Sequence, residues 1–271
     1  MILGFQGVPG SYSEQALLKY FGDEYEKKCY QNFEDVFVAL QNEQIKYGVL
    51  PIENSTTGSI TQNYDLLKKF GYFIVGEVSV KIEHHLLGLK GAKLSQLTHI
   101  YSHPQGFDQC SEYLKKLPHC QQVAYHNTAI SAKFVHESNS LTNAAIGSKR
   151  AAQLYGLEIL DSQISNAKEN VTRFIVVAKH LENDPSCNKM TLIFNLPDVA
   201  GSLLGVLHQF AEESVNLVKI ESRPVGDGSF SYYFYVDIIG NKKDENIKRV
   251  LEKVKGESEN LRILGCYKNN I

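Results

Sequence analysis

The chain has 271 residues, of which 43% are hydrophobic and 21% charged, the composition of an ordinary globular protein. A chain of this length is expected to form about two domains, each large enough to bury its own core. The formal net charge of −2 gives no reason to expect a nucleic acid or an acidic membrane surface as partner. The five cysteines are scattered and never spaced as Cys-x-x-Cys, which disfavours a disulfide framework or a structural zinc site and favours a reducing compartment.

The first residues run directly into an apolar strand, without the basic and apolar regions of a signal peptide. No apolar run approaches the roughly 20 residues that a membrane-spanning helix needs. On these features we expect a cytoplasmic protein.

Apolar strands alternate with polar loops and helices in the first two thirds of the chain. The first strand leads through a Gly-Val-Pro-Gly turn into a helix, where Ser11 and Glu14 have the spacing of a capping box. The strand at 47–52 leads into a second helix, where Ser59 and Gln62 repeat that spacing. Three more units of strand, loop and helix follow, at 98–114, 122–135 and 144–154. This alternation predicts an α/β fold with a mostly parallel sheet.

The pattern changes near 181–188, where polar residues and a proline replace the apolar ones. Beyond this point the predicted elements are a strand at 189–196, a helix at 201–214, strands at 216–224 and 230–239 joined by Gly226-Asp227-Gly228, a helix at 244–255 and a strand at 261–267. This β-α-β-β-α-β order is that of a ferredoxin-like domain. We therefore divide the chain into a first domain at 1–184 and a second at 189–271.

The polar loops of the first domain each follow a strand and precede a helix, where free backbone N–H groups and the helix dipole favour an anion. Ligands of open α/β sheets bind beyond the carboxyl ends of the strands, so we expect several loops to line one cleft. Their hydroxyl and amide side chains suit a small carboxylated molecule, and they are Ser55, Thr56, Gln105, Asn127, Thr128 and Ser131. Any one of them alone is better explained as a cap of its own helix, and only their repetition favours binding.

Other chemistries find little support in the sequence. Gly7 and Gly10 lack the lysine of a phosphate-binding loop and the spacing of a dinucleotide fingerprint. The rings of His84 and His85 should face opposite sides of a strand, which suits a metal site badly. Cys110 has no evident catalytic partner. The sequence predicts neither a metal nor a cofactor.

Six motifs stand in order along the first domain. They are Gly7-x-x-Gly10-Ser11-Tyr12-Ser13-Glu14-x-Ala16, Pro51-Ile52-Glu53-Asn54-Ser55-Thr56-x-Gly58-Ser59-Ile60, His103-Pro104-Gln105, Asn127-Thr128-Ala129-x-Ser131-Ala132, Ala145-Ile146-Gly147-Ser148 and Asn170-Val171-Thr172-Arg173-Phe174. With these motifs the chain resembles the prephenate dehydratase family over nearly its whole length. The resemblance implies a two-lobed catalytic domain, similar to periplasmic binding proteins, with mostly parallel sheets and a cleft between the lobes.

Two further motifs make the second domain similar to the ACT domain, which these enzymes carry for feedback by L-phenylalanine. They are Gly201-Ser202-Leu203-Leu204, where many members have Gly-Ala-Leu-Val, and Glu221-Ser222-Arg223-Pro224. The resemblance assigns all eight residues to effector binding and implies a homodimer or homotetramer formed through the ACT domains. No chorismate mutase segment precedes the first strand, so the resemblance is to the monofunctional enzyme.

The family's reaction removes carbon dioxide and hydroxide from prephenate and yields phenylpyruvate. The resemblance assigns the central role to Thr172, as a donor to the leaving hydroxyl, with Arg173 holding a carboxylate and Phe174 shaping the pocket. Glu53 would protonate the leaving group if burial raised its pKa. Substrate hydrogen bonds are assigned to Asn54, Ser55, Thr56, Gln105, Asn127, Thr128 and Ser131.

Plainer interpretations remain open at this point. Glu53 fits equally well as a helix cap or as the partner of a lysine, Arg173 as a surface cation, and Phe174 as a core aromatic residue. Arogenate dehydratase, which performs the same chemistry on the transaminated substrate, is not separated from prephenate dehydratase. A non-catalytic amino-acid sensor on a binding-protein fold is the alternative from another class, and a third has the ACT module acting on a partner protein.

Overall fold

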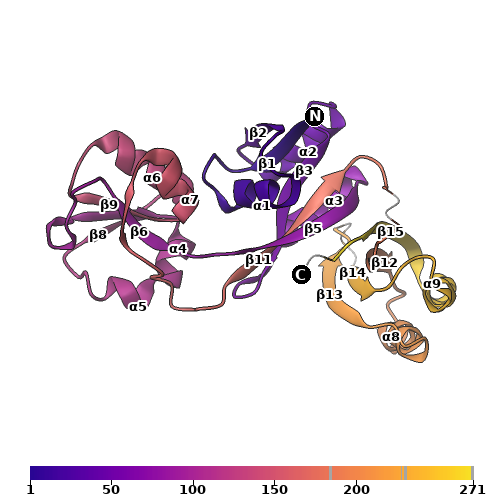
Figure 1. Cartoon of the computed structure of the whole chain (residues 1–271). Helices are drawn as coiled ribbons and strands as arrows, with labels where there is room; N and C mark the ends of the chain where they lie inside the picture. The colour runs from indigo at the N-terminus through magenta and orange to yellow at the C-terminus, as the bar shows by residue number, and fades with distance from the viewer. Residues whose placement is uncertain (183–184, 227, 229–230, 270–271) are drawn as a thin grey trace. The chain divides into compact units, whose positions relative to one another are not determined.

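The computed structural model describes residues 1–182, 185–226, 228 and 231–269 (Figure 1). The chain forms two compact units: the first comprises 1–36, 54–58 and 79–172, and the second comprises 37–53, 59–78 and 173–271. Both units therefore draw on separated stretches of the chain. The domain boundary inferred from the sequence stays a prediction, and its residue 184 lies outside the described residues.

The first unit contains the parallel pair β1 (Ile2–Gln6) and β2 (Glu26–Tyr30), with α1 (Tyr12–Phe21), and a five-stranded sheet in the order β10-β6-β9-β7-β8. The strands of this sheet are β6 (His85–Gly88), β7 (His99–Ser102), β8 (Gln121–Ala124), β9 (Asn143–Gly147) and β10 (Glu158–Asp161). Its helices are α4 (Pro104–Gln109), α5 (Ser111–Leu114), α6 (Thr128–Ser138) and α7 (Lys149–Tyr155). A helix, α2 (Phe33–Gln41), runs from this unit into the second.

This sheet is mixed, whereas the sequence predicted a mostly parallel one. β7 is parallel to β8 and β9, but β6 is antiparallel to both β9 and β10. Parallel neighbours require a long crossover, usually through a helix. β6 follows β5 (Phe73–Lys81) after only three residues and enters a different sheet, so no such crossover sets its direction.

Consecutive side chains of β6 belong to two different hydrophobic cores, because strand residues point alternately to opposite faces. Leu86 packs with residues of α4 and α5, including Cys110 and Leu114. Leu87 packs with residues of α6 and α7, including Val135 and Ala151. Helices thus cover both faces of the sheet, as the α/β pattern requires.

In the second unit β3 (Tyr47–Asn54), β11 (Val171–Ala178) and β5 lie side by side in that order, with β4 (Gly58–Ser59) beside β3. The helix after β4 is α3 (Thr61–Phe70), whose N-cap residue is Ile60 and provides no side-chain cap. The capping box predicted from Ser59 is therefore wrong. The hydroxyl of Ser59 instead donates to the carboxylate of Glu221. At α1 the predicted cap is confirmed, because Ser11 accepts from the N–H of Glu14, while the Glu14 carboxylate accepts from the N–H of Gly10 and not from that of Ser11.

The C-terminal part of the second unit has the predicted ferredoxin-like order. Its elements are β12 (Lys189–Asn195), α8 (Ser202–Glu212), β13 (Leu217–Pro224), β14 (Tyr232–Ile239), α9 (Glu245–Glu257) and β15 (Glu259–Tyr267). The strands form an antiparallel sheet in the order β13-β14-β12-β15. Residue 230, the predicted start of β14, and residue 227 of the predicted bend lie outside the described residues.

Helices α8 and α9 cover one face of this sheet (Figure 1). Met190, Leu192 and Phe194 of β12 share a buried core with Phe210 of α8 and Val250 of α9. Their spacing of two follows from the strand and leaves the intervening side chains for the opposite face. None of the described helices has the length and apolar character that a membrane span requires.

Cys187 and Cys266 form a disulfide. Cys187 lies just before β12, and Cys266 lies near the end of β15. This pair departs from the expectation of reduced cysteines drawn from the sequence. The two residues are 79 positions apart, and only the pairing of β12 with β15 brings them together. Cys29, Cys110 and Cys120 are free thiols.

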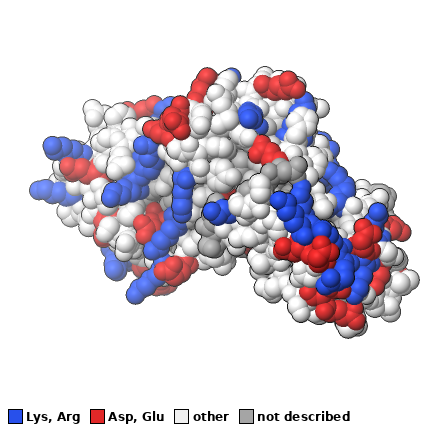
Figure 2. Space-filling view, turned by 45° about the vertical axis from the view of Figure 1, so that its right-hand side comes forward, with Lys and Arg blue, Asp and Glu red and all other residues white. Residues whose placement is uncertain are grey.

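Basic and acidic side chains are interspersed on the face of the molecule that Figure 2 shows. The basic residues of the last helix have acidic partners. Lys248 pairs with Glu245, Arg249 with Glu213, and Lys253 with both Glu212 and Glu213. These ion pairs make this face of α9 (Glu245–Glu257) a charge-paired helix surface.

Gly265 of β15 lies so close to β5 that a Cβ atom there would overlap the carbonyl oxygen of Ile74. We predict that Gly265→Ala lowers the free energy of unfolding by about 1–3 kcal/mol, because neither backbone can yield without disturbing its sheet. Gly256→Ala is the control, since a Cβ at this position of α9 meets open space and should raise stability by up to about 1 kcal/mol. Urea denaturation of both variants measures the difference, and equal stabilities would contradict the prediction.

Candidate active site

The side chain of Asn54, at the end of β3, organises a buried hydrogen-bond network in the first unit. Its Oδ1 accepts from the backbone N–H groups of Thr56 and Thr57, at 3.0 and 3.1 Å. Its Nδ2 donates to Asn170 Oδ1 at 2.7 Å and to Thr172 Oγ1 at 2.9 Å. Because Asn54 and Thr172 are only 7% exposed, this network is held in a largely water-free setting.

The orientation of the Asn54 amide determines the role of the Thr172 hydroxyl. A backbone N–H can only donate, so the two N–H groups of the loop identify their common partner as the amide oxygen. The atom facing Thr172 is then the NH2 group, and Thr172 Oγ1 accepts from it. The proton of the Thr172 hydroxyl is consequently available to another acceptor, such as a bound substrate.

The neighbouring residue Ser55 fixes the backbone that leads into β11. Its N–H donates to the carbonyl of Val171 at 2.9 Å, and its hydroxyl accepts from the N–H of Val171 at 3.0 Å. The loop after β3 and the start of β11 are therefore joined through both backbone and side chain. This arrangement positions Thr172, the next residue in the chain.

Of the other predicted substrate-binding residues, Gln105 joins this network and the rest lie on their own helix. Gln105 Nε2 donates to Thr57 Oγ1 at 3.3 Å. Asn127 caps α6 by accepting from the N–H of Ile130, and the hydroxyl of Ser131 donates to the carbonyl of Asn127. Thr128 is the first residue of α6. For Asn127 and Ser131 the structure thus shows the helix-capping interpretation, and binding stays a prediction.

A surface hollow of about 490 Å³ lies next to two of these residues in the chain. It is lined by His103, Pro104, Ala124, Tyr125 and His126. Gln105 follows its first two lining residues and Asn127 its last three. Its volume falls in the range of small-molecule sites.

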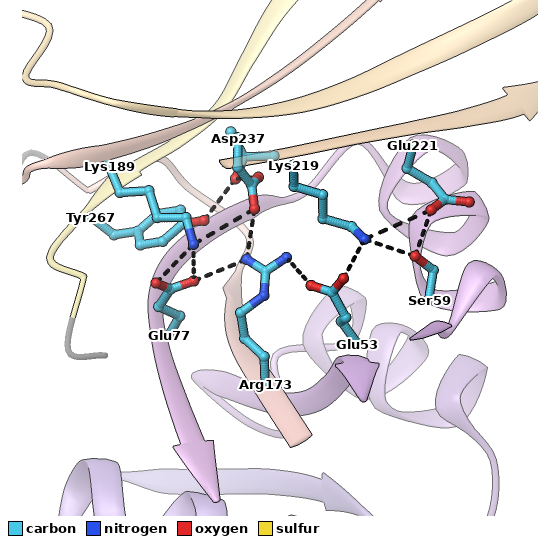
Figure 3. Close-up of polar contacts among 10 residues, drawn as sticks. Glu53, Ser59, Glu77, Arg173, Lys189, Lys219, Glu221, Asp237 and Tyr267 are labelled. Carbon is cyan, nitrogen blue, oxygen red and sulfur yellow. Dashed lines mark hydrogen bonds and ion pairs between the residues drawn. The ribbon is translucent and has the colours of Figure 1, made fainter. Parts of the chain in front are cut away.

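Glu53, one residue before Asn54, belongs to a second network that lies in the second unit (Figure 3). One of its oxygens accepts from Lys219 Nζ at 2.8 Å, and the other accepts from Arg173 Nη2 at 3.2 Å. Burial raises the pKa of Glu53, but the hydrogen bonds and charges of Lys219 and Arg173 outweigh it, so its pKa lies below the usual value. Glu53 is therefore ionised at neutral pH and does not meet the condition set for a proton donor. The lysine-paired alternative is the one observed.

Arg173 is buried among protein carboxylates and is not the surface cation of the plainer interpretation. Its side chain is 10% exposed, and its Nη1 donates to Asp237 at 2.6 Å and to Glu77 at 3.0 Å. With the bond to Glu53, the guanidinium binds three carboxylates of the protein itself (Figure 3). The structure thus gives it partners other than a substrate carboxylate.

The same network continues into the ferredoxin-like sheet. Lys189 Nζ donates to both oxygens of Glu77, at 2.8 and 2.9 Å. Thr191 donates to Asp237 at 2.7 Å and lies 2.7 Å from the hydroxyl of Tyr267. We call the seven charged residues of this network the ionic cluster, and they are Glu53, Glu77, Arg173, Lys189, Lys219, Glu221 and Asp237.

Phe174 is 2% exposed and is one of the largest fully buried side chains, as expected of a core aromatic residue. Cys110 is also buried, and burial raises the pKa of its thiol to about 12, so that it is protonated at neutral pH. A thiol of this kind is a poor nucleophile. His84 Nε2 lies 2.8 Å from Gln109 Oε1, and burial lowers the pKa of its imidazole.

The sequence did not single out four charged residues of the ionic cluster: Glu77, Lys189, Lys219 and Asp237. A signal was present, because Lys219 stands between Val218 and Ile220 and Asp237 between Val236 and Ile238. Charged residues are seldom fully buried unless they are paired. Each was nevertheless consistent with the polar side of a half-buried strand, and its partner was distant in sequence.

The predicted effector residues lie at the start of α8 and along β13. Gly201 precedes α8 in a left-handed conformation, with φ of 90°, and the hydroxyl of Ser202 donates to the carbonyls of Pro197 and Val199. Arg223 binds Asp65 of α3 with two hydrogen bonds, at 3.0 and 2.7 Å. The remaining members are Leu203, which packs against the core of this domain, Leu204, which is exposed, Glu221, Ser222 and Pro224, the last residue of β13.

Residues 3–182 match the family model of prephenate dehydratase, and residues 190–256 match that of the ACT domain. The chain belongs to the prephenate dehydratase family. Over 271 aligned residues, which are 97% of this chain and 70% of the relative, it is 40% identical to the bifunctional chorismate mutase/prephenate dehydratase of Buchnera aphidicola.

Two solved structures are similar over the whole fold. One is prephenate dehydratase from Arthrobacter aurescens in complex with L-Phe, with a TM-score of 0.89 and 30% identity over 99% of this chain and 90% of that chain. The other is described as GqqA, a novel type of quorum quenching acylase, with a TM-score of 0.90 and 31% identity over 100% and 98%. These similarities confirm the α/β fold with a C-terminal ACT domain.

The lowered pKa of Glu53 predicts a pH-dependent contribution to stability. Its ion pairs are complete above the unfolded-state pKa of about 4.3, and their contribution is lost as the pH falls through the lower folded-state pKa. We predict that Glu53→Gln is less stable than the wild type at about pH 7 and that the difference shrinks on acidification below about pH 4.

Urea denaturation at several pH values measures this difference. Glu245→Gln is the matched control, because its pair with Lys248 is exposed and should contribute little at any pH. A constant difference between wild type and Glu53→Gln across this range would contradict the assignment.

Proposed function

We propose that this protein is a prephenate dehydratase that converts prephenate to phenylpyruvate, carbon dioxide and water, with L-phenylalanine as feedback inhibitor. Family membership over most of the chain supports the reaction. The observation that carries the site assignment is the hydrogen bond from Asn54 to Thr172, since it leaves the Thr172 proton to be donated. A donor of this kind is what the departing hydroxide requires.

The chemistry asks little more of the protein than orientation and a well-placed donor. Loss of carbon dioxide and hydroxide makes the ring aromatic, which drives the reaction, and the barrier lies in expelling a poor leaving group. The Asn54 amide, which donates to Thr172 Oγ1, makes the hydroxyl a better donor and holds its direction. Positioned proton donors contribute about 10²–10⁴-fold. Thr172 is accordingly proposed as an orienting donor, with Ser55, Thr56 and Gln105 near the substrate.

This proposal gives a structural role, and not contact with the substrate, to Arg173, Phe174 and Glu53. Arg173 and Glu53 bind each other and further charged residues, and Phe174 is in the core. We assign to these three the fixing of the strand ends that carry Thr172 and Asn54. The substrate-binding roles of Asn127, Thr128 and Ser131 remain proposals on the ground of their motif.

L-phenylalanine is proposed to bind the ACT domain through the two motifs at 201–204 and 221–224. The start of α8 has no side-chain cap, and although the N–H of Ser202 donates to the carbonyl of Val199, the next N–H groups of the first turn suit the carboxylate of an amino acid. The solved relative from Arthrobacter aurescens is a complex with L-Phe. We propose the cytoplasm as the compartment, as for a biosynthetic enzyme of this family. The three free thiols fit a reducing compartment, whereas the disulfide between Cys187 and Cys266 does not follow from one.

The first experiment measures conversion of prephenate and, in parallel, of arogenate by the purified protein. We predict turnover of prephenate that added L-phenylalanine suppresses, and a loss of about 10²-fold or more in kcat for Thr172→Ala, because the donor is removed. Turnover of arogenate but not of prephenate would show that arogenate is the substrate. No turnover of either by folded protein would overturn the proposed function.

Asn54→Asp tests the direction of the hydrogen bond. A carboxylate still accepts from the loop N–H groups but cannot donate to Thr172, whose hydroxyl would then turn toward it. The variant should keep the fold and lose kcat nearly as strongly as Thr172→Ala, whereas Thr172→Ser should retain most of the activity. Wild-type kcat in the Asn54→Asp variant would contradict the role of the Thr172 proton.

A homodimer or homotetramer formed through the ACT domains is the proposed assembly. β13 is an edge strand, and it exposes Val218 and Ile220, while Leu204 at α8 is 71% exposed. Exposed apolar side chains on an edge strand favour association with a second copy. We predict that sedimentation gives a mass of at least two chains and that Ile220→Lys lowers it, and a monomeric wild type would contradict this assembly.

A further inference from the structure

Two pairs of consecutive residues each contribute one member to the candidate active site and one to the ionic cluster. Asn54 and Thr172 bind each other at 2.9 Å. Their chain neighbours Glu53 and Arg173 bind each other at 3.2 Å. Successive residues of a strand point to opposite faces. The bond between Asn54 and Thr172 therefore lies on one face of β3 and β11, and the bond between Glu53 and Arg173 lies on the other. A movement of Glu53 relative to Arg173 therefore acts directly on the backbone that carries Asn54 and Thr172.

An unbroken series of contacts leads from the predicted effector motif to this pair (Figure 3). The hydroxyl of Ser59 donates to Glu221, and Lys219 Nζ donates to Ser59 at 2.8 Å. The same ammonium group donates to Glu53 at 2.8 Å, and Glu53 accepts from Arg173. Three side chains, those of Ser59, Lys219 and Glu53, thus connect Glu221 with Arg173 through four contacts, and all of these contacts lie within the second unit.

One part of the ionic cluster is a fixed anchor, which comprises Glu77, Arg173, Lys189 and Asp237. Glu77 is fully buried, and Lys189 and Asp237 are about 5% exposed or less. Glu77 and Asp237 each bind both cations, Arg173 and Lys189. Removing any member would leave buried charges with one partner fewer, which is strongly unfavourable. Arg173 is therefore held firmly on this side.

The rest of the cluster is less constrained and comprises Glu53, Lys219 and Glu221. Lys219 is the residue that can change its partner. Its Nζ lies 2.8 Å from Glu53 and 3.7 Å from Glu221, so it is closer to the first carboxylate but within reach of the second. Glu53 is 35% exposed and Glu221 is 20% exposed, in contrast to the buried anchor. A small shift of the ammonium group toward Glu221 would release Glu53. Two such arrangements form the kind of alternative that a ligand can bias.

Tyr64 of α3 provides an unused donor near the same place. Its side chain is buried, and its hydroxyl has no hydrogen-bond partner among the described residues. Burial raises the pKa of this hydroxyl, and the charges of Asp237, Glu53 and Glu221 raise it further, which places the ring among these carboxylates. Lys219 also lies over the Tyr64 ring, 6.0 Å from its centroid. A buried unpaired donor is consistent with a second arrangement in which it is satisfied.

We infer that Lys219 is a positioning residue that couples the effector motif to the candidate active site, by exchanging between Glu53 and Glu221. This inference rests on the proposed function. An amino acid bound at 221–224 changes the surroundings of Glu221. The ammonium group of Lys219 then moves toward Glu221 and breaks its hydrogen bond to Glu53. Glu53, next to Arg173, is held less firmly as a result. The strand ends that carry Asn54 and Thr172 then lose their catalytic alignment, and inhibition reaches the site without contact between effector and substrate.

Lys219→Met tests the coupling, because it removes the charge and keeps an apolar stem beside Tyr64. Lys219→Arg is the conservative variant, since its guanidinium can still reach both carboxylates. Lys68→Met is the matched control, because Lys68 also joins α3 to the ACT domain, through the Val225 carbonyl and the Tyr233 ring, without touching the ionic cluster. The three variants and the wild type are compared as full-length chains.

Three quantities are measured for each protein: prephenate turnover without effector, the fold inhibition by saturating L-phenylalanine relative to that protein's own turnover, and L-phenylalanine affinity by calorimetry. We expect Lys219→Met to bind the effector but lose about 10-fold or more of the inhibition ratio. Lys219→Arg and Lys68→Met should keep the ratio. A merely structural lysine would change turnover and leave the ratio unaltered.

Full inhibition of Lys219→Met would overturn the inference, as would loss of effector binding by this variant, which would make Lys219 part of the binding site. If Lys219→Met does not fold, Ser59→Ala decides, because it removes only the hydroxyl between Lys219 and Glu221 and should reduce the ratio in the same direction. An unchanged ratio in a folded Ser59→Ala would overturn the inference. Wild-type protein without turnover or without inhibition would overturn the proposed function, and the inference with it.

Discussion

The guanidinium of Arg173 donates to three carboxylates in a part of the protein that largely excludes water. Charges in such a place are tolerated only when partners of opposite sign and hydrogen bonds replace the lost hydration. Lys189 supplies a second cation for Glu77 and Asp237, and Thr191 donates to the remaining oxygen of Asp237. The ACT strands β12 and β14 and the catalytic strands β5 and β11 therefore share a single set of charges. None of the four can shift without leaving a buried charge uncompensated.

The opposite face of the same strand ends has a different character. Asn54, Thr172 and Asn170 are neutral side chains, and their hydrogen bonds have a direction that the loop N–H groups impose. A neutral network of fixed polarity can present a hydroxyl proton at neutral pH without competing charges. The separation also explains why Glu53 and Asn54, adjacent in one motif, serve different purposes. The carboxylate is neutralised by cations, and the amide sets the orientation of the donor.

In the proposed regulation, the peptide bonds that join Glu53 to Asn54 and Thr172 to Arg173 connect the ionic cluster with the candidate site, so that no long pathway is required. Three further contacts join β13 and β14 to α3. They are the pairs Arg223 with Asp65, Tyr233 with Lys68, and Tyr235 with the Tyr64 carbonyl. These contacts fix the sheet against the helix, whereas Lys219 lies within reach of two carboxylates, those of Glu53 and Glu221. Stability and regulation can thus depend on the same interface while resting on different residues.

The sequence by itself determined the order of the elements and the ferredoxin-like second domain, because these follow from local periodicity, capping and turn chemistry. Asn54 and Thr172 were identified by the resemblance of their motifs to those of a known family. It did not determine the direction of β6, which depends on entry into a second sheet, or the pairing of Cys187 with Cys266 across 79 positions. Ser59 had the spacing of a cap, but Glu221, 162 positions away, took its hydroxyl. The partners of Glu53 and Arg173 were likewise decided by tertiary structure. A charged side chain acts through the partners that it meets, and those partners come from strands that only folding brings together.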